Sequence, residues 1–347
     1  MRFTTTRRDG NPKMDESFLE LAPEDRKEIL QTLSVKLGQA PAVLEKDVWV
    51  CWALQQLFAM PGGIPMAFKG GTSLSKVFNA IQRFSEDIDI TLDYRALDSG
   101  ASPFKEGISN SQLSKLTKGL RAAVRNYTSS VVGPHFQKMI AEQFGDAAYR
   151  MELSENGEQL HIYYRPLFSS TNILDHIFIE FGGRNAIEPS DKHIVRPYIA
   201  PELPSLRFPE ASVQVLSGAR TFWEKATLIH VVCNKASPDN LDRWSRHWSD
   251  LAVLADHQIG KDAIADRELL ADVVKHKSAF YRTGDVSYGP CCKGGLQLVP
   301  GTEVLSLLEA DFRTMLADGM FYGEQPVFRE IIVRLTMLQK EINKTFA

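Results

Sequence analysis

The chain has 347 residues, of which 44% are hydrophobic and 24% are charged, and its formal net charge is −3. This length exceeds one compact core of usual size, so we expect two or three packed units. The near balance of charge excludes a generic polyanion-binding protein and leaves any contact with nucleic acid to local patches.

The sequence gives no sign of secretion or of a membrane span. Its first 18 residues are basic but have no apolar run behind them, so we expect no secretory signal. The most apolar run, residues 48–60, contains two glutamines and is shorter than the roughly 20 residues of a bilayer span. Four cysteines without CxxC spacing indicate reduced thiols. We therefore expect a cytoplasmic protein with no membrane partner.

In chain order, helical spacing covers residues 15–60, with the clearest helix expected at 40–58. Further on, the patterns predict strands at 64–69, 87–92, 151–155, 159–167 and 174–183, and helices at 74–84 and 110–128. From residue 218 the pattern is almost wholly helical, apart from a glycine-rich loop at 282–301. The sequence thus predicts an α+β fold in three parts: an N-terminal helical segment at 1–60, a core with a mixed sheet at 61–215 and a C-terminal helical domain at 216–347.

The expected strand DIDITL, residues 87–92, carries two carboxylates at positions i and i+2. Side chains two residues apart on a strand share one face, so Asp87 and Asp89 lie together while Ile88 faces the other side. Such a pair suits Mg²⁺, which takes oxygen ligands and keeps waters and substrate phosphates in its shell. Solvated charge on a strand edge would show the same pattern, so the pair alone leaves both interpretations open.

The segment KGGTS, residues 69–73, lies between an expected strand and an expected helix. Glycines there let backbone amides turn toward an anion, and Thr72 or Ser73 would cap the helix with its amide end facing phosphate. A plain capped turn would explain KGGTS, but not its place directly before the acidic strand. Neither the GxxxxGK[ST] nor the GxGxxG pattern is present. We therefore expect a phosphate-binding turn beside a metal-binding strand.

Together these motifs resemble those of the AbiEii/AbiGii-type nucleotidyltransferase toxins, within the DNA polymerase β-like nucleotidyltransferase superfamily. Similar stretches run through most of the chain: LEKDVWVCWAL (44–54), FKGGTSLSK (68–76), RFSEDIDI (83–90), IFIEFGGR (177–184), EKATLIH (224–230), SRHWSDLAVL (245–254) and FYGEQPVF (321–328). The combination of the glycine motif with RFSEDIDI is quite specific. The long segment 91–172 departs from the family pattern and separates Glu180 from the acidic strand.

The resemblance implies a polymerase β-like core that uses Mg²⁺ and a nucleoside triphosphate (NTP), transfers a nucleotide and releases pyrophosphate. It implies a toxin of a toxin–antitoxin, or abortive infection, system, with a cognate antitoxin as partner and RNA, notably the acceptor end of tRNA, as acceptor. By motif, it implies nucleotide binding by Lys69, Gly70, Gly71, Thr72, Ser73, Arg83 and Ser85, and catalytic roles for Asp87, Asp89, Lys225 and Asp250.

The later candidates each have a plain structural alternative. Glu180, on an expected strand followed by two glycines, suits a third metal ligand or a charged strand end. Lys225 flanks an apolar helical stripe, from which its ammonium could reach a triphosphate or stay at the surface. Arg243, His247 and Asp250 lie at i, i+4 and i+7 of an expected helix, which is the spacing of one polar stripe.

For nucleotidyl transfer, two metal ions about 3.5–4 Å apart can stabilise both the attacking and the leaving oxygen. We expect Asp87, Asp89 and Glu180 to hold metal, KGGTS to cradle the β and γ phosphates, and Lys225 and Arg83 to offset leaving-group charge. Either Asp89 or Asp250 would accept the proton of the nucleophile. An RNA acceptor, or solvent alone, could cover a basic helical stripe formed by Lys115, Lys118, Arg121 and Arg125.

Two other functions stay open at this point. The same chemistry could modify a protein hydroxyl instead of RNA. Alternatively, the chain could be a catalytically silent module that binds nucleotide, RNA or a partner protein, although the intact carboxylate pair disfavours this.

Overall fold

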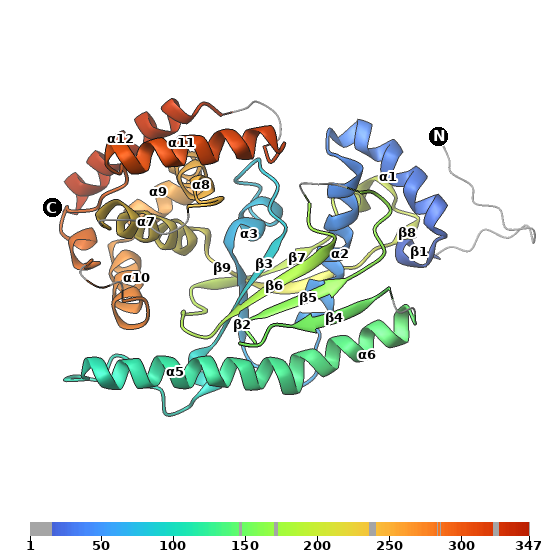
Figure 1. The fold of residues 1–347 in the computed structure, drawn as a ribbon, viewed down its shortest axis with the longest axis horizontal. Coiled ribbons are helices and arrows are strands. Elements are labelled where there is room, and N and C mark those ends of the chain that lie inside the picture. The colour runs from blue at the N-terminus through green and yellow to red at the C-terminus, as the bar shows by residue number, and fades with distance from the viewer. Residues whose placement is uncertain are drawn as a thin grey trace, which may run out of the picture.

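The computed structural model describes residues 16–145, 148–169, 173–235, 241–282, 284, 286–321 and 326–346. Within these ranges the chain is an α+β protein with a mixed sheet at its centre and helices around it (Figure 1). The predicted fold class is therefore confirmed. Part of the family-like stretch FYGEQPVF, residues 322–325, lies outside the described residues.

The central sheet has seven strands among the described residues, in the order β4-β5-β6-β3-β2-β9-β7. They are β2 (Met66–Lys69), β3 (Asp87–Leu92), β4 (Arg150–Leu153), β5 (Gln159–Tyr163), β6 (His176–Gly182), β7 (Ser190–Val195) and β9 (Ala211–Leu216). The sheet is mixed, because β3 runs antiparallel to β2 but parallel to β6. A separate parallel pair joins β1 (Glu16–Ser17) to β8 (Leu206–Arg207).

Helices before the last strand pack against the sheet or against one another. They are α1 (Pro23–Leu37), α2 (Pro41–Phe58), α3 (Gly70–Lys76), α4 (Tyr94–Leu97), α5 (Asn110–Tyr127) and α6 (Gly133–Gln143). A π-helical turn, Thr128–Val132, joins α5 to α6, so the two form one long rod below the sheet (Figure 1). Short 3₁₀ helices lie at Phe18–Glu20, Ala200–Glu202 and Gly289–Cys292.

The C-terminal part of the chain forms a helical lobe beside the sheet (Figure 1). It contains α7 (Gly218–Asn234), α8 (Ser245–Asp256), α9 (Gln258–Ala265), α10 (Arg267–Phe280), α11 (Thr302–Ala317) and α12 (Phe328–Thr345). This lobe has its own apolar cluster, with Trp223 and Trp248 fully buried at its centre. The helical pattern after residue 218 therefore reflects a lobe that buries its own core.

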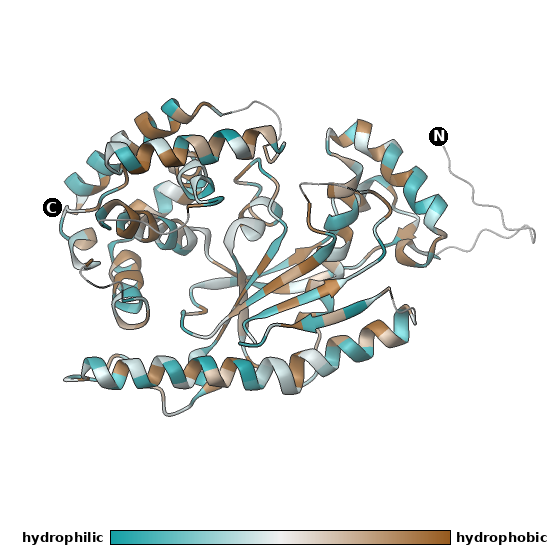
Figure 2. Cartoon of the chain, in the orientation of Figure 1, coloured by the Kyte–Doolittle hydropathy of each residue, from teal (hydrophilic) through white to brown (hydrophobic). Residues whose placement is uncertain are grey.

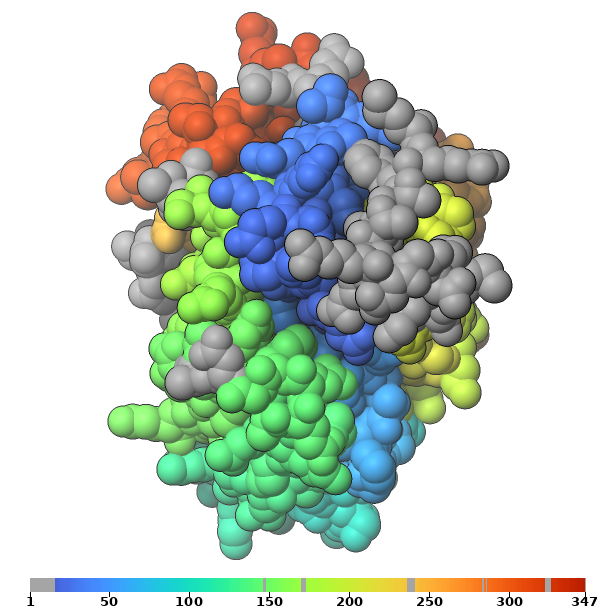
Figure 3. Space-filling view, turned by 90° about the vertical axis from the view of Figure 1, so that its right-hand side faces the viewer, coloured from blue at the N-terminus to red at the C-terminus, as the bar shows by residue number. Residues whose placement is uncertain are grey.

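The sheet has a second core, to which α2 contributes. Trp49 and Trp52 of α2 are each 2% exposed and pack in one cluster with Ile88 and Ile90 of β3. Figure 2 shows apolar residues along the strands, while α5 alternates between apolar and polar residues. In Figure 3 the N-terminal segment (blue) lies directly against residues from the middle of the chain (green). Residues 41–58 thus belong to the core of the sheet.

Most of the predicted elements are present, but the helix expected at 74–84 is wrong. Helix α3 starts at once after β2 and ends at Lys76. Asn79 then has a φ of 47°, in the left-handed region that interrupts a right-handed helix. Ala80 and Ile81 pack into the core of the helical lobe. The apolar residues of this segment are buried against two different cores, and their spacing matches that of a helix without forming one.

None of the helices in the described ranges combines the length and the apolar character needed to cross a membrane.

Candidate active site

Three neighbouring strands place three charged side chains in one row across the sheet. Lys69 on β2 pairs in register with Asp89 on β3, and Asp89 pairs with Glu180 on β6. Residues in register on adjacent strands point to the same face, so this row places an ammonium and two carboxylates side by side. Asp87 lies two residues before Asp89 and shares that face. The predicted carboxylate pair is therefore accompanied by Glu180.

The two glycines after β2 are required by the close approach of site side chains. A Cβ atom on Gly70 would lie 1.9 Å from Asp89 Oδ2, and Gly70 has a φ of +81°. A Cβ atom on Gly71 would lie 2.5 Å from Arg83 Nη2 and 2.7 Å from Ser85 Oγ. Because real Cβ atoms do not approach other atoms so closely, the glycine pair lets β3 and the preceding loop come against the turn. This contact joins KGGTS to RFSEDIDI in space.

These groups line one pocket of about 190 Å³ between the sheet and the helical lobe. The predicted residues that line it are Lys69, Gly70, Gly71, Arg83, Ser85, Asp87, Asp89, Glu180 and Lys225. A larger hollow of about 1190 Å³ lies near α6 and residues 196–210. It contains the exposed ion pair of Arg196 and Glu210, but its lining includes none of the predicted site residues. The size of a hollow therefore does not identify the chemical site.

Asp250 of α8 lies beneath the pocket between two cations. Arg83 donates two hydrogen bonds to its carboxylate, at 2.6 and 2.8 Å, and Lys225 Nζ lies 2.9 Å from Asp250 Oδ2. Burial alone would raise the pKa of Asp250, but Arg83 and Lys225 outweigh it and hold this pKa below its usual range. A buried carboxylate paired in this way is a poor proton acceptor. Its contacts favour positioning of Arg83 and Lys225, in place of the expected role as a base.

The hydroxyls of the turn face inward rather than toward an anion. The structure shows no side-chain cap on α3, so the prediction that Thr72 or Ser73 caps this helix is wrong. Both residues lie inside α3: Thr72 donates to the backbone oxygen of Asp87 at 2.5 Å, and Ser73 donates to that of Gly70 at 2.9 Å. Ser85 lies 3.1 Å from the Thr72 hydroxyl and reaches the pocket. The hydroxyls of Thr72 and Ser73 therefore fix the backbone of the site, and their contact with phosphate stays a prediction.

Helix α8 begins later than the sequence suggested. Arg243 has a φ of 58° and precedes α8, which starts at Ser245, so the predicted stripe through Arg243 is wrong. The backbone N–H of Arg243 donates to Asp311 instead. Arg246 and His247 both line the pocket, and Arg246 Nη1 lies 3.7 Å from Asp87 Oδ2. Arg246 lies one helical turn before Asp250, and this spacing could have identified Arg246 as a site residue.

Two further charged residues of the pocket escaped the sequence analysis. Glu224 precedes Lys225 on α7, and its carboxylate lies 3.3 Å from Lys69 Nζ. Lys277 reaches the pocket from α10. Glu224 stood inside a family-like stretch, but its helical position alone did not separate it from a surface acid. Lys277 had no sequence signal, because only the packing of α10 beside α7 brings it to the site.

The chemistry of the donor set fits a divalent cation. Burial raises the pKa of Asp89, an effect that Asp87 reinforces and Lys69 opposes. Burial and Asp89 likewise raise the pKa of Glu180. Within the described ranges, however, no group of three or more His, Cys, Asp or Glu side chains could hold a metal ion by itself. A metal held here would therefore share its ligands between the aspartate pair and a bound phosphate, as Mg²⁺ commonly does.

The mixed sheet, the glycine turn and the strand with two aspartates, set against a helix with a buried lysine, are the features of a nucleotidyltransferase core. A family model described as "Nucleotidyl transferase AbiEii toxin, Type IV TA system" matches residues 52–334. Because the match spans well over half of the chain, the chain belongs to this family of toxins from toxin–antitoxin systems. The family named from the sequence motifs is thus confirmed.

No curated protein matches the chain. Among solved structures, the chain is similar to MenT4, a nucleotidyltransferase toxin from Mycobacterium tuberculosis H37Rv, with 15% sequence identity and a TM-score of 0.38. That similarity covers 94% of this chain and 98% of the MenT4 chain.

Proposed function

We propose that this toxin transfers a nucleotide from an NTP to RNA, with the acceptor end of tRNA as the expected target, and releases pyrophosphate. The observation that carries this proposal is the single pocket in which the glycine turn, Asp87, Asp89 and Lys225 meet. Family membership supports the reaction class. The choice of RNA rests on the resemblance of the sequence motifs.

In the proposed reaction, a hydroxyl oxygen of the acceptor bonds to the α-phosphorus of the NTP. The bond from that phosphorus to the β-bridging oxygen breaks, and the electron pair leaves with pyrophosphate. Lys225 and Arg246 stabilise the negative charge that develops on the leaving group, because both cations line the pocket. Asp89 accepts the proton of the hydroxyl, since the alternative acceptor, Asp250, is already paired with two cations.

The residues that would hold Mg²⁺ are Asp87 and Asp89, with Glu180 beside them in the row. A bound divalent ion supplies positive charge that stabilises the reacting phosphate and the leaving pyrophosphate. Lys69 lies on the other side of Asp89 and keeps its ammonium charged. Burial lowers the pKa of Lys69, but Glu224, Tyr281 and Asp89 together more than offset this. The site thus combines carboxylates for metal with ammonium groups for phosphate.

An antitoxin protein is the expected partner, since the family consists of toxins from toxin–antitoxin systems. NTP and RNA are both cytoplasmic, so we place the proposed reaction in the cytoplasm.

The direct test incubates the purified full-length protein with each of four α-labelled NTPs, total RNA and a protein extract. Label in the RNA fraction that depends on Mg²⁺ and disappears with Asp87→Ala supports the proposal. Label in the protein fraction would instead identify a protein hydroxyl as the acceptor. Growth arrest by a folded Asp87→Ala variant would contradict an enzymatic toxin and support the silent binding module.

A further inference from the structure

The charged groups of the pocket fall into two sets on different sides of the carboxylates. The first set surrounds Asp87 and Asp250 and consists of Arg83, Lys225 and Arg246. The second set surrounds Glu224, on the side of the lobe where α7 and α10 meet, and includes Lys69 and Lys277. One cation set is enough to hold the triphosphate of an NTP, so the second set requires its own explanation.

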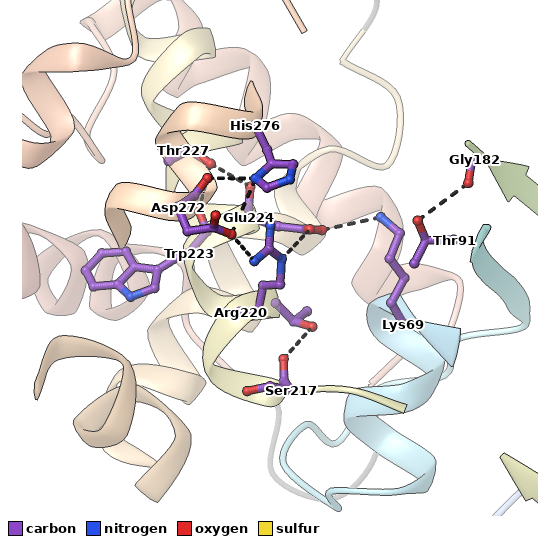
Figure 4. Close-up of polar contacts among 11 residues, drawn as sticks. Lys69, Thr91, Gly182, Ser217, Arg220, Trp223, Glu224, Thr227, Asp272 and His276 are labelled. Carbon is purple, nitrogen blue, oxygen red and sulfur yellow. Dashed lines mark hydrogen bonds and ion pairs between the residues drawn. The ribbon is translucent and has the colours of Figure 1, made fainter. Parts of the chain in front are cut away.

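Glu224 is already shared by other cations of the second set. Its carboxylate lies 3.3 Å from Lys69 Nζ and 3.7 Å from Arg220 Nε (Figure 4). Arg220 also pairs with Asp272 at 2.6 Å, so this chain of charges continues away from the pocket. Burial raises the pKa of Glu224, but Lys69, Lys277 and Arg220 together lower it. One carboxylate therefore faces three cations.

Lys277 is the cation that this arrangement leaves uncompensated. Within the described part of the chain, no carboxylate forms an ion pair with Lys277, whose ammonium lies 4.7 Å from the centre of the Tyr281 ring. Burial lowers the pKa of Lys277 to about 8, an effect that Glu224 opposes and Lys69, Arg220 and Arg184 reinforce. A desolvated ammonium without its own counter-ion is unfavourable, and a bound anion would relieve it.

Arg184 adds a second positive charge near Lys277. It lies two residues after the end of β6, and its guanidinium lies 5.0 Å from the centre of the same Tyr281 ring. The side chain of Arg184 is half-buried, and no carboxylate pairs with it within the described ranges. Lys277, which lines the pocket, and Arg184, from the segment after β6, thus converge on one aromatic ring.

We propose that Lys277 and Arg184 bind a backbone phosphate of an RNA acceptor and so hold its terminal hydroxyl beside the row of carboxylates. This inference rests on the proposed function and identifies which end of the pocket receives the second substrate. Both reactants are then polyanions, which accounts for a cation set on each side of the carboxylates. A protein hydroxyl would bring no phosphate, and would leave Lys277 without an anion.

The surface next to Tyr281 is also basic, which supports the approach of RNA from this side. Arg282, next to Tyr281, hydrogen-bonds to Asn110 at the start of α5. Tyr281 also packs in one apolar cluster with Leu113 and Leu116 of α5. The exposed basic stripe of α5 therefore begins close to the second cation set, and it could contact further phosphates: Lys115, Lys118, Arg121 and Arg125.

The test compares Lys277→Gln, Arg184→Gln and the double variant with Lys275→Gln, a matched control that removes an exposed lysine from the same helix. Fluorescence anisotropy measures binding of a labelled single-stranded oligoribonucleotide to each full-length protein over a range of salt. We expect each site variant to bind at least about tenfold more weakly. The slope of log affinity against log salt should shrink by about 0.7 for each cation removed. Lys275→Gln should match the wild type in both.

Steady-state transfer to total tRNA separates acceptor binding from NTP binding. The site variants should raise KM for tRNA while KM for the NTP stays within about twofold of wild type, and melting curves should confirm folding. Arg184 is partly exposed and is not among the residues that line the pocket, so Arg184→Gln keeps the test valid if Lys277→Gln does not fold. Unchanged RNA affinity and salt slope in folded variants would overturn the inference, as would label carried only by protein. If wild type transfers nothing, the proposed function fails, while the anisotropy measurement still decides the inference.

Discussion

The glycine turn makes a sharp prediction, because Gly70 has both a left-handed backbone and a carboxylate against it. In Gly70→Ala, the new Cβ would meet Asp89 Oδ2 at 1.9 Å and Asp89 Cγ at 2.8 Å. The φ of +81° adds about 1–2 kcal/mol of backbone strain, and the overpacking adds about 1–3 kcal/mol. We therefore expect a total loss of about 2–5 kcal/mol in the free energy of unfolding. Displacement of Asp89 by about 1 Å would also cost on the order of a hundredfold in transfer rate.

Gly38→Ala is the matched control for this prediction. Gly38 ends α1 with a φ of +64°, but a Cβ there would meet nothing within 4 Å. We expect the control to lose only the unfolding free energy that the backbone strain costs, about 1–2 kcal/mol, and to keep its activity. Urea denaturation measures the stability of both variants, and transfer of labelled nucleotide measures their activity. Wild-type activity in Gly70→Ala would refute the close contact between the turn and β3.

Three further predictions concern charge and metal. Asp250→Asn leaves Arg83 and Lys225 buried without their anion, and we expect urea denaturation to show a loss of about 3–5 kcal/mol. Burial raises the pKa of Glu45 to about 7, above its unfolded value, so its contribution to stability is present below about pH 4.5 and is lost as the pH rises through 7. Glu45→Gln should therefore lose less unfolding free energy than wild type between pH 5 and pH 8. A chelator should abolish nucleotide transfer, and added Mg²⁺ should restore it.

Each of these predictions has a clear opposite outcome. Asp250→Asn with wild-type stability would mean that the two cations do not depend on this carboxylate. Equal pH dependence in Glu45→Gln and wild type would show that Glu45, whose carboxylate accepts the Leu167 N–H at 2.9 Å, titrates normally in the folded protein. Transfer that continues in excess chelator would exclude a required divalent ion.

The local chemistry of the site could be predicted because it lies in contiguous motifs. Alternation in DIDITL gave the shared face of Asp87 and Asp89, and the observed strand has the same bounds, Asp87–Leu92. The basic helix at 110–128 is likewise found, as α5. In both cases the period of the sequence matches the period of one regular element.

What could not be predicted depends on contacts between distant segments. Glu180 was expected as a third ligand, but its own spacing left a charged strand end equally open, because its place beside Asp89 depends on β6 joining β3 across the long segment 91–172. Lys277 enters the pocket only because α10 packs against α7. Asp250 was a candidate proton acceptor, and only the folded chain reveals Arg83 and Lys225 on its carboxylate. Residue type and spacing carry no information about such partners.

Binding of Mn²⁺, used as a paramagnetic substitute for Mg²⁺, tests the shared metal–nucleotide site most directly. Electron paramagnetic resonance would count the ions bound with and without a non-hydrolysable NTP analogue, in wild type and in Asp87→Asn/Asp89→Asn. We predict tight Mn²⁺ binding in wild type only when the analogue is present, and its loss in the double variant. Equally tight binding in the double variant would contradict the assignment of these two carboxylates.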